Sequence, residues 1–227
     1  MFYPELDKDD SLALHTDLYE INMMYTYFKK GIADRNAVFE VFYRKEPFGN
    51  GYAVYAGLEH VIDYLKNLKF KESDLQYLKE QEDYDDDFID YLRNLKLKLT
   101  IRSMREGELV FANEPILQVE GPLAQCQLVE TAILNIINFQ TLLATKAARI
   151  KLAVQDDSIM EFGSRRAQET DAAIWGTRAA YIGGFDSTSN VRAGKLFNIP
   201  ISGTHAHSLV EAFGSEYEAF KAYAETH

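Results

Sequence analysis

The sequence predicts a mixed α/β fold in two parts: an α+β part with an antiparallel sheet over residues 1–120, and a βα part over residues 121–227. Residues 36–120 contain alternating and β-branched apolar runs separated by helical patterns. From Gly121 onward, glycine-rich turns separate short apolar runs from helical segments, which is typical of barrel and doubly wound folds. An apolar content of 47% with 13% aromatic residues indicates a folded globular chain.

The chain is acidic, with 227 residues, a formal net charge of -11 and an isoelectric point near 4.9. An acidic surface repels nucleic-acid phosphates and anionic lipids, so binding to either is disfavoured. Cys126 is the only cysteine, which excludes an internal disulfide and a multi-thiolate metal site. Residues 1–10 lack the basic flank and apolar run of a secretory signal, and no uncharged stretch reaches the roughly 20 residues of a membrane span. We therefore expect a cytoplasmic protein.

The first helix and the first strand follow from residue periodicity. Apolar residues recur at helical spacing from Leu18 to Phe28, so we expect a helix capped by Thr16 that ends before Gly31. Residues 37–45, AVFEVFYRK, are rich in β-branched and aromatic side chains and predict a strand.

Three helices are expected next. Apolar residues at helical spacing predict a helix over residues 58–65. Ser73 and Gln76 form a capping-box pattern that opens the following helix. The three aspartates at residues 85–87 are interpreted as a solvated helix start that complements the helix dipole, rather than as a metal site.

Two further strands complete the expected antiparallel sheet. Residues 95–102, LKLKLTIR, alternate strictly between apolar and polar side chains and predict a half-exposed strand. Glu106 and Gly107 form a turn into a second apolar run over residues 109–119. Pro115 interrupts this run, because proline is tolerated in a sheet only at an edge or a bulge.

The second part begins with a long helical pattern over residues 123–154, in which we expect a break near residues 138–139. Strands are then expected at three apolar runs, each followed by glycine and polar residues: residues 159–162, 183–185 and 198–201. Residues 208–225 predict one amphipathic helix without a closing glycine. In barrel and doubly wound folds, sites lie at the carboxyl ends of the strands, which is where these polar residues fall.

Two of these polar clusters are suited to anions. Arg165 and Arg166 follow a strand and Gly163, and a guanidinium group binds carboxylates and phosphates through two parallel hydrogen bonds. The alternative for either arginine is a surface ion pair. Residues 183–190, GGFDSTSN, precede a helix whose backbone N–H groups can hold a phosphate. A left-handed turn followed by a helix cap explains the same residues equally well.

The densest polar cluster is residues 203–208, GTHAHS. His205 and His207 share a face if this segment is a strand, but they diverge by about 200° at the start of a helix. A zinc pair, a structural histidine, and a nucleophilic or acid–base histidine are all compatible with the sequence.

Four motifs in this order resemble the nicotinate phosphoribosyltransferase family: TDLY at residues 16–19, EFGSRRAQ at 161–168, GGFDSTSN at 183–190 and GTHAHS at 203–208. The resemblance spans essentially the whole chain. It implies the first part of an irregular βα barrel of the type II phosphoribosyltransferase kind, incomplete at residue 227. It also implies transfer of phosphoribose from phosphoribosyl pyrophosphate to nicotinate in NAD biosynthesis, giving nicotinate mononucleotide and pyrophosphate, with Mg²⁺ and with ATP hydrolysis coupled through a phosphohistidine.

The same resemblance assigns roles to single residues. His207 is the phosphorylated, catalytic histidine, Tyr19 lies against the pyridine ring, and Thr204 lies near nicotinate. The expected substrate-binding residues are Tyr19, Gly163, Arg165, Arg166, Asp186, Ser187, Ser189, Thr204 and Ser208. The family is a homodimer whose sites lie between subunits, so Tyr19 serves either its own pocket or the partner's.

Other functions remain open at this point. A nicotinamide or quinolinate phosphoribosyltransferase predicts a similar architecture, but the first and last motifs argue against it. Because family chains are about twice as long, we expect residues 1–227 alone to be inactive, and a non-catalytic partner that binds a pyridine nucleotide is the alternative outside the enzymes.

Overall fold

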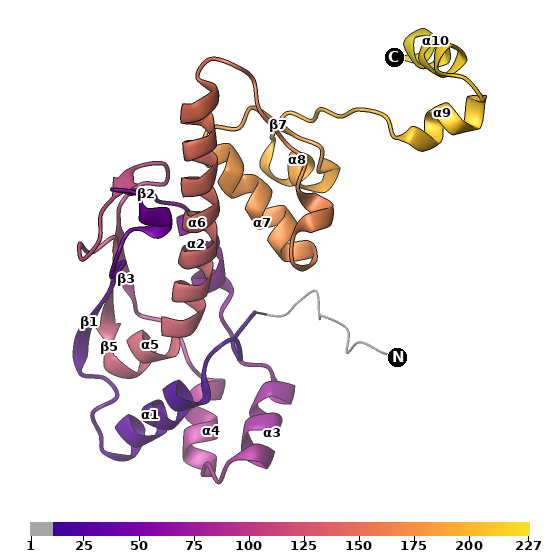
Figure 1. The fold of residues 1–227 in the computed structure, drawn as a ribbon. Helices are drawn as coiled ribbons and strands as arrows, with labels where there is room; N and C mark the ends of the chain where they lie inside the picture. The colour runs from indigo at the N-terminus through magenta and orange to yellow at the C-terminus, as the bar shows by residue number, and fades with distance from the viewer. Residues whose placement is uncertain (1–10) are drawn as a thin grey trace.

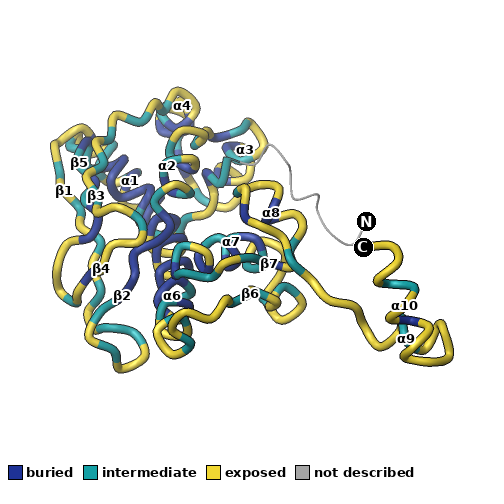
Figure 2. Tube along the Cα trace, turned by 90° about the horizontal axis from the view of Figure 1, so that it is seen from above, coloured by how far each residue is buried: buried dark blue, intermediate teal, exposed yellow. Residues whose placement is uncertain are grey.

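The computed structural model describes residues 11–227, so the expectation for residues 1–10 lies outside the described residues. The antiparallel strands and the helices around them form one side of the molecule, and α7, α8 and β7 lie on the other side of the long helix α6 (Figure 1). The last two helices, α9 and α10, extend away from this body (Figures 1 and 2). None of the helices among residues 11–227 has both the length and the apolar character needed to cross a membrane.

The helices are α1 (Leu18–Lys29), α2 (Leu58–Asn67), α3 (Glu72–Gln81), α4 (Asp86–Arg93), α5 (Leu123–Leu128), α6 (Glu130–Val154), α7 (Glu169–Ile182), α8 (Val191–Phe197), α9 (His207–Phe213) and α10 (Glu216–Thr226). The strands are β1 (Asn36–Val41), β2 (Ala53–Val54), β3 (Thr100–Ser103), β4 (Leu109–Val110), β5 (Leu117–Pro122), β6 (Met160–Glu161) and β7 (Ser187–Thr188). Single turns of 3₁₀ helix occur at η1 (Pro47–Gly49) and η2 (Ser164–Arg166).

The prediction of an antiparallel sheet with helices over residues 36–120 is confirmed. Strand β5 lies between β1 and β3 and pairs antiparallel with both, so that Val119 is opposite Phe39 on one side and Ile101 on the other. Strands β2 and β4 form a second antiparallel pair. One continuous core of buried side chains joins β5 to α1, α2, α4, α5 and α6, because every second residue of β5 faces inward.

The strand predicted at residues 95–102 is wrong over its first half. Hydrogen-bonded pairing begins only at Thr100, although burial of residues 95–99 alternates as the sequence predicts. The side chain of Gln125 replaces a neighbouring strand here. Its Oε1 accepts the backbone N–H of Lys98 at 2.6 Å, and its Nε2 donates to the backbone oxygen of Lys96 at 3.2 Å. The extended backbone is therefore satisfied by a glutamine from α5.

Two predicted helix caps are wrong. The residue before α1 is Asp17 rather than Thr16, because the Thr16 hydroxyl hydrogen-bonds Glu20 instead of a backbone N–H. Helix α3 begins at Glu72, so Ser73 and Gln76 lie inside it.

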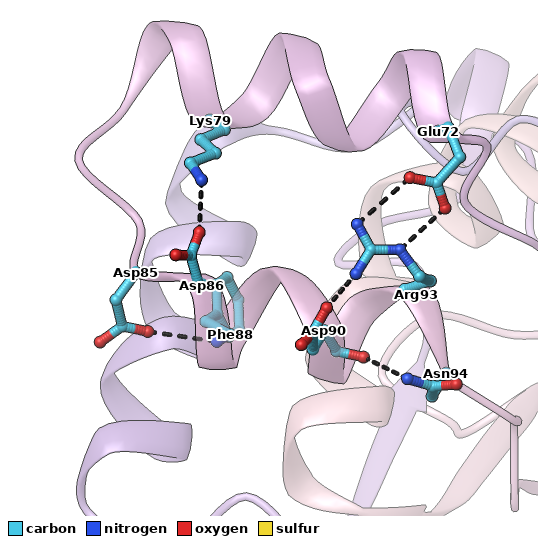
Figure 3. Close-up of polar contacts among 8 residues, drawn as sticks. All are labelled: Glu72, Lys79, Asp85, Asp86, Phe88, Asp90, Arg93 and Asn94. Carbon is cyan, nitrogen blue, oxygen red and sulfur yellow. Dashed lines mark hydrogen bonds and ion pairs between the residues drawn. The ribbon is translucent and has the colours of Figure 1, made fainter.

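The predicted helix start at the aspartate triplet is confirmed, since Asp85 caps α4 by accepting the backbone N–H of Phe88 at 3.1 Å. Surface ion pairs fasten α3 to α4: Arg93 binds Glu72, and Lys79 binds Asp86 (Figure 3). The aspartates are therefore a helix start with ion pairs, as expected from their position.

The break expected near residues 138–139 lies earlier, at Val129, where α5 ends and α6 begins. Helix α6 runs uninterrupted through residues 138–139 because tertiary contacts hold it on both sides. Toward the antiparallel strands, the Thr145 and Thr141 hydroxyls accept the backbone N–H groups of Val54 at 2.8 Å and Ala56 at 3.2 Å. The threonine hydroxyls of α6 thus take the hydrogen bonds that a neighbouring strand would otherwise accept from the backbone around β2.

On its other side, α6 approaches α7 closely. A Cβ added at Gly183 would lie 2.4 Å from the backbone oxygen of Ala144 and 2.6 Å from Cβ of Ala147. Glycine at position 183 and alanines on α6 therefore set the distance between the two helices.

The parallel strands are shorter than predicted. Strand β6 pairs with β7, and Thr188 forms a single parallel bridge with Ile201. The run at residues 183–185 is not a strand, because Gly183 ends α7 and the strand follows at residues 187–188. The single helix predicted at residues 208–225 is also wrong: Gly214 adopts a left-handed conformation between α9 and α10.

A half-buried ion pair joins the two sides of the molecule. Arg178 on α7 donates to Glu106 through Nη1 at 2.9 Å and Nη2 at 2.6 Å, and the N–H of Gly57 donates to the same carboxylate at 2.6 Å. The side chains are 15% and 14% exposed. Burial alone would raise the pKa of Glu106, but the hydrogen bonds and charge of Arg178 outweigh it and lower the pKa.

Replacement of this arginine tests the ion pair. We expect Arg178→Met to lower the free energy of unfolding by about 3 kcal/mol, because Glu106 is then left without its partner away from water. The matched control is Arg102→Met, whose pair with Glu120 is more exposed, at 60% and 31%, and whose loss should lower the free energy of unfolding clearly less. Urea denaturation measures both losses, and equal losses would contradict the prediction.

Glu20 is a fully buried carboxyl group between α1 and the start of α6. It accepts hydrogen bonds from the backbone N–H of Thr131 at 2.9 Å and from its hydroxyl at 3.0 Å. Burial nevertheless raises the pKa of Glu20 from 4.5 to about 7. The folded state therefore holds a proton that the unfolded state has released, and the stability that this proton supplies is lost as the pH rises from 4.5 through 7.

We expect Glu20→Gln to become more stable relative to the wild type as the pH rises through this window, by on the order of 2 kcal/mol, because glutamine does not ionise. The control is Glu72→Gln. The pKa of Glu72 is lowered by Arg93, so the difference in stability should change with pH in the opposite direction. Unfolding at a series of pH values measures both, and parallel curves for Glu20→Gln and the wild type would refute the assignment.

Candidate functional site

An open hollow of about 780 Å³ lies at the carboxyl ends of β6 and β7. It gathers side chains from η2, the start of α8 and the segment before α9, and is lined by Phe162, Ser164, Arg165, Ser189, Val191, Ile201, Ser202, Gly203, Thr204, His205, Ala206 and His207. Four of the residues predicted from the sequence meet here: Arg165, Ser189, Thr204 and His207. The hollow lies where parallel strands of α/β proteins present their ligand sites.

Arg165 supplies the positive charge of this hollow. It lies in the single 3₁₀ turn that follows β6, and its side chain is exposed. Arg166 is exposed but does not line the hollow, and neither does Gly163. Of the two adjacent arginines, only Arg165 lines the hollow that Thr204 and His207 also line.

Glu161 holds the turn that carries Arg165. Its carboxylate accepts the backbone N–H of Gly163 and the hydroxyls of Thr177 and Thr188, both at 2.8 Å. It thereby connects β6 to α7, β7 and the 3₁₀ turn. Glu161 belongs to the motif at residues 161–168, but no role for it follows from the sequence alone. The signal that points to it is an acidic residue inside an apolar run followed by glycine.

The loop at residues 183–190 contains the features of a turn with a helix cap. Gly184 has a φ of +102°, and the side chain of Asn190 accepts the N–H of Ala193 at 3.0 Å. Asp186 faces away from the hollow's lining, because its carboxylate accepts the N–H of Ile159 at 2.8 Å. That backbone hydrogen bond lowers the pKa of Asp186. Ser187 pairs with Met160 in the sheet and does not line the hollow either.

The two histidines lie on either side of a helix start. His207 is the first residue of α9 and is exposed, whereas His205 precedes the helix and packs against the rings of Phe220 at 5.1 Å and Tyr223 at 5.8 Å. Ser208 lies outside the lining. Among residues 11–227, no three histidine, cysteine or acidic side chains are grouped so that they could hold a metal ion.

Tyr19 belongs to a different surface. It lines a second hollow of about 480 Å³ together with Arg44 and Phe42, and this hollow shares no residue with the one around Arg165. The Tyr19 hydroxyl donates to Glu130 at 3.1 Å. Desolvation, followed by this carboxylate, raises the pKa of Tyr19 to about 12, so the phenol stays protonated at neutral pH. Within one chain, Tyr19 and His207 are not brought together.

Known proteins resemble this chain over most of its length. It is 65% identical over 220 residues to a nicotinate phosphoribosyltransferase of Bacillus subtilis, a match that covers 97% of this chain and 45% of the relative. It is 45% identical over 219 residues to a nicotinate phosphoribosyltransferase of Caenorhabditis elegans, which covers 94% of this chain and 39% of the relative. The chain therefore spans less than half the length of these relatives.

Solved structures agree. The human nicotinic acid phosphoribosyltransferase superposes with a TM-score of 0.82 at 40% identity, covering 87% of this chain and 40% of the human chain. A nicotinate-nucleotide pyrophosphorylase of Pyrococcus furiosus superposes with a TM-score of 0.77 at 25% identity, covering 98% and 49%.

The family model described as the nicotinate phosphoribosyltransferase N-terminal domain matches residues 14–138, which include α1, the antiparallel strands and the start of α6. This match covers more than half of the chain and includes the first of the four sequence motifs, at residues 16–19. The chain belongs to the nicotinate phosphoribosyltransferase family.

Proposed function

We propose that the chain forms the N-terminal half of a nicotinate phosphoribosyltransferase, which makes nicotinate mononucleotide and pyrophosphate from nicotinate and phosphoribosyl pyrophosphate. The observation that carries the proposal is the convergence of Arg165, Ser189, Thr204 and His207 at one hollow, from separate segments of the chain. The whole enzyme's activity requires residues that its longer relatives have beyond the matched region, and we expect residues 1–227 alone to be inactive.

The side chains at the hollow suit anionic substrates. A protein with a net charge of -11 needs local donors to bind a carboxylate or a phosphate, and Arg165 offers a guanidinium group for either. Ser189 and Thr204 add hydroxyl donors. Because His207 is exposed on the same hollow, its imidazole is accessible to a phosphoryl donor such as ATP.

The separation of Tyr19 from this hollow supports a site between two subunits. Tyr19 has an aromatic face that can stack on a pyridine ring, but it lines another surface of its own chain. We therefore propose a homodimer in which Tyr19 serves the partner's site. The proposed location of this enzyme is the cytoplasm. The same proposal includes two domains, at residues 1–120 and 121–227, and a βα part that closes into a barrel. Strand β5 crosses this boundary, since it continues to Pro122.

Magnesium is the metal ion that the family resemblance implies. The described residues do not fit a magnesium site of their own, because no three acidic, histidine or cysteine side chains among them are grouped to hold an ion. Asp186, in the loop at residues 183–190, accepts the N–H of Ile159 and pairs with Lys151. Mg²⁺ commonly binds through substrate phosphates with few protein ligands.

The coupling of ATP to the transfer is tested through His207. The suitable protein is a chimera in which this chain replaces the matching part of the Bacillus subtilis relative. With ATP labelled in its terminal phosphate, we expect an acid-labile phosphoprotein that His207→Ala abolishes, together with the stimulation by ATP. His205→Ala is the matched control and should keep both. If His205→Ala loses the label while His207→Ala keeps it, the assignment is wrong.

The choice of pyridine is tested in the same chimera. We expect kcat/KM for nicotinate to exceed that for nicotinamide by about tenfold or more, since hydrogen bonds to a charged carboxylate contribute about 1.5–3 kcal/mol. Arg165→Ala combined with Arg166→Ala should remove most of this preference, and lysine at both positions should restore only part of it. Equal kcat/KM values for the acid and the amide would contradict this preference.

A further inference from the structure

Glu161 is an acidic residue next to a hollow whose other features suit anions. It is the last residue of β6 and is half-buried, and it does not line the hollow itself, although Phe162 and Ser164 after it do. A carboxylate close to an anion site repels the anion, so the charge of Glu161 is unfavourable for the binding of nicotinate or a phosphate. The contacts of Glu161 indicate what it contributes instead.

The carboxylate of Glu161 is bound by neutral donors from three segments. Its Oε1 accepts the backbone N–H of Gly163, and its Oε2 accepts the hydroxyls of Thr177 on α7 and Thr188 on β7, both at 2.8 Å. The two threonines are 2% and 0% exposed. The carboxylate therefore joins the first residue before the Arg165 turn to the buried base of the site.

The backbone of Glu161 holds a second wall of the hollow. Its carbonyl oxygen accepts the N–H of Ser189 at 3.0 Å, and Ser189 lines the hollow. Thr188, whose hydroxyl binds the Glu161 side chain, also accepts the N–H of Asn190 at 3.0 Å. The turn with Arg165 and the loop with Ser189 are thus both hydrogen-bonded to one residue.

Gly163 leaves room for this arrangement. A Cβ added at Gly163 would lie 2.8 Å from Oε1 of Glu161, which is closer than van der Waals contact. Any larger residue at position 163 would therefore displace the carboxylate from the backbone N–H that it accepts. Glycine at this position serves the contact with Glu161, whereas it does not line the hollow.

We propose that Glu161 is a positioning residue of the anion site. It holds the turn so that the guanidinium group of Arg165 meets the carboxylate of nicotinate, and it thereby sets the choice of the acid over the amide. The proposal rests on the proposed function, in which Arg165 binds that carboxylate. Glu161 acts through Arg165 and supplies hydrogen-bond acceptors, not charge, to the site.

Glutamine can make the same contacts without the charge. Its amide oxygen accepts the N–H of Gly163, and its amide N–H groups donate to the hydroxyls of Thr177 and Thr188. Those hydroxyls can then donate to the backbone oxygens of Ala173 at 2.8 Å and of residue 161 at 3.3 Å. Substitution therefore separates position from charge: Glu161→Gln keeps the geometry and removes the repulsion, whereas Glu161→Ala removes both.

Binding of nicotinate and nicotinamide to the chimera described above, measured by calorimetry, tests the proposal. Glu161→Ala should weaken nicotinate about tenfold and leave nicotinamide within about twofold, because the hydrogen bonds of an aligned guanidinium group favour the charged carboxylate. Glu161→Gln should bind nicotinate as tightly as the wild type or more tightly. The matched control is Glu114→Ala, at an exposed residue between β4 and β5, which should change neither affinity.

A double variant tests whether the effect passes through Arg165. Adding Glu161→Ala to Arg165→Ala should weaken nicotinate by less than about a further twofold, since both substitutions remove the same contact. If thermal unfolding finds that Glu161→Ala does not fold, Gly163→Ala decides the question, because it displaces the carboxylate and keeps it in the chain.

Unchanged or tighter binding of nicotinate in the alanine variant at position 161 or 163 would overturn the proposal, and so would equal losses for alanine and glutamine at position 161. A failure of the proposed function has a different result. A chimera that shows this pattern of nicotinate binding but releases no pyrophosphate from either pyridine would contradict the proposed function and support the role of Glu161.

Discussion

The structure depends on the packing of α6 between two unlike neighbours. Toward the antiparallel strands, the hydroxyls of Thr141 and Thr145 satisfy backbone N–H groups that would otherwise need another strand. Toward α7, small residues allow contact close enough that a Cβ at Gly183 would collide with Ala144. Helix α6 can therefore bind a strand edge and a helix together, and the pair of Arg178 with Glu106 strengthens the same junction.

The position of the turn that carries Arg165 depends on the packing of α7 against α6. Helix α7 is held against α6, and Thr177 on α7 donates to the carboxylate of Glu161, which in turn holds the turn before Arg165. Thr188 donates to the same carboxylate from β7. The carboxylate of Glu161 thus links helix α7 to the turn that carries the guanidinium group of Arg165. The arrangement is rigid at its base, where Thr177 and Thr188 are buried, and open at its rim, where Arg165 and His207 are exposed.

Local patterns predicted the elements whose causes are local. Periodicity identified the helices at residues 18–29 and 58–67 and the antiparallel sheet, and the aspartates at residues 85–87 marked a helix start. The failures involve partners far away in sequence. The side chain of Gln125 replaces a strand next to residues 95–99, and packing on both faces carries α6 through residues 138–139. The motifs located Arg165, Thr204 and His207, but no spacing rule reveals that Tyr19 lines another hollow or that Oε1 of the buried Gln140 has no hydrogen-bond partner among residues 11–227.

The single bridge at Ile201 has a consequence for the behaviour of the protein in solution. Ile201 is 60% exposed and Val191 beside it in the hollow is 68% exposed, so an apolar surface lies next to an edge of the parallel sheet. At neutral pH, the net charge of -11 makes separate molecules repel one another. That repulsion disappears near the isoelectric point of about 4.9, and the apolar edge is then free to pair with a second molecule. For residues 1–227 on their own, separation of molecules in solution therefore depends on the net negative charge rather than on any protection of this edge.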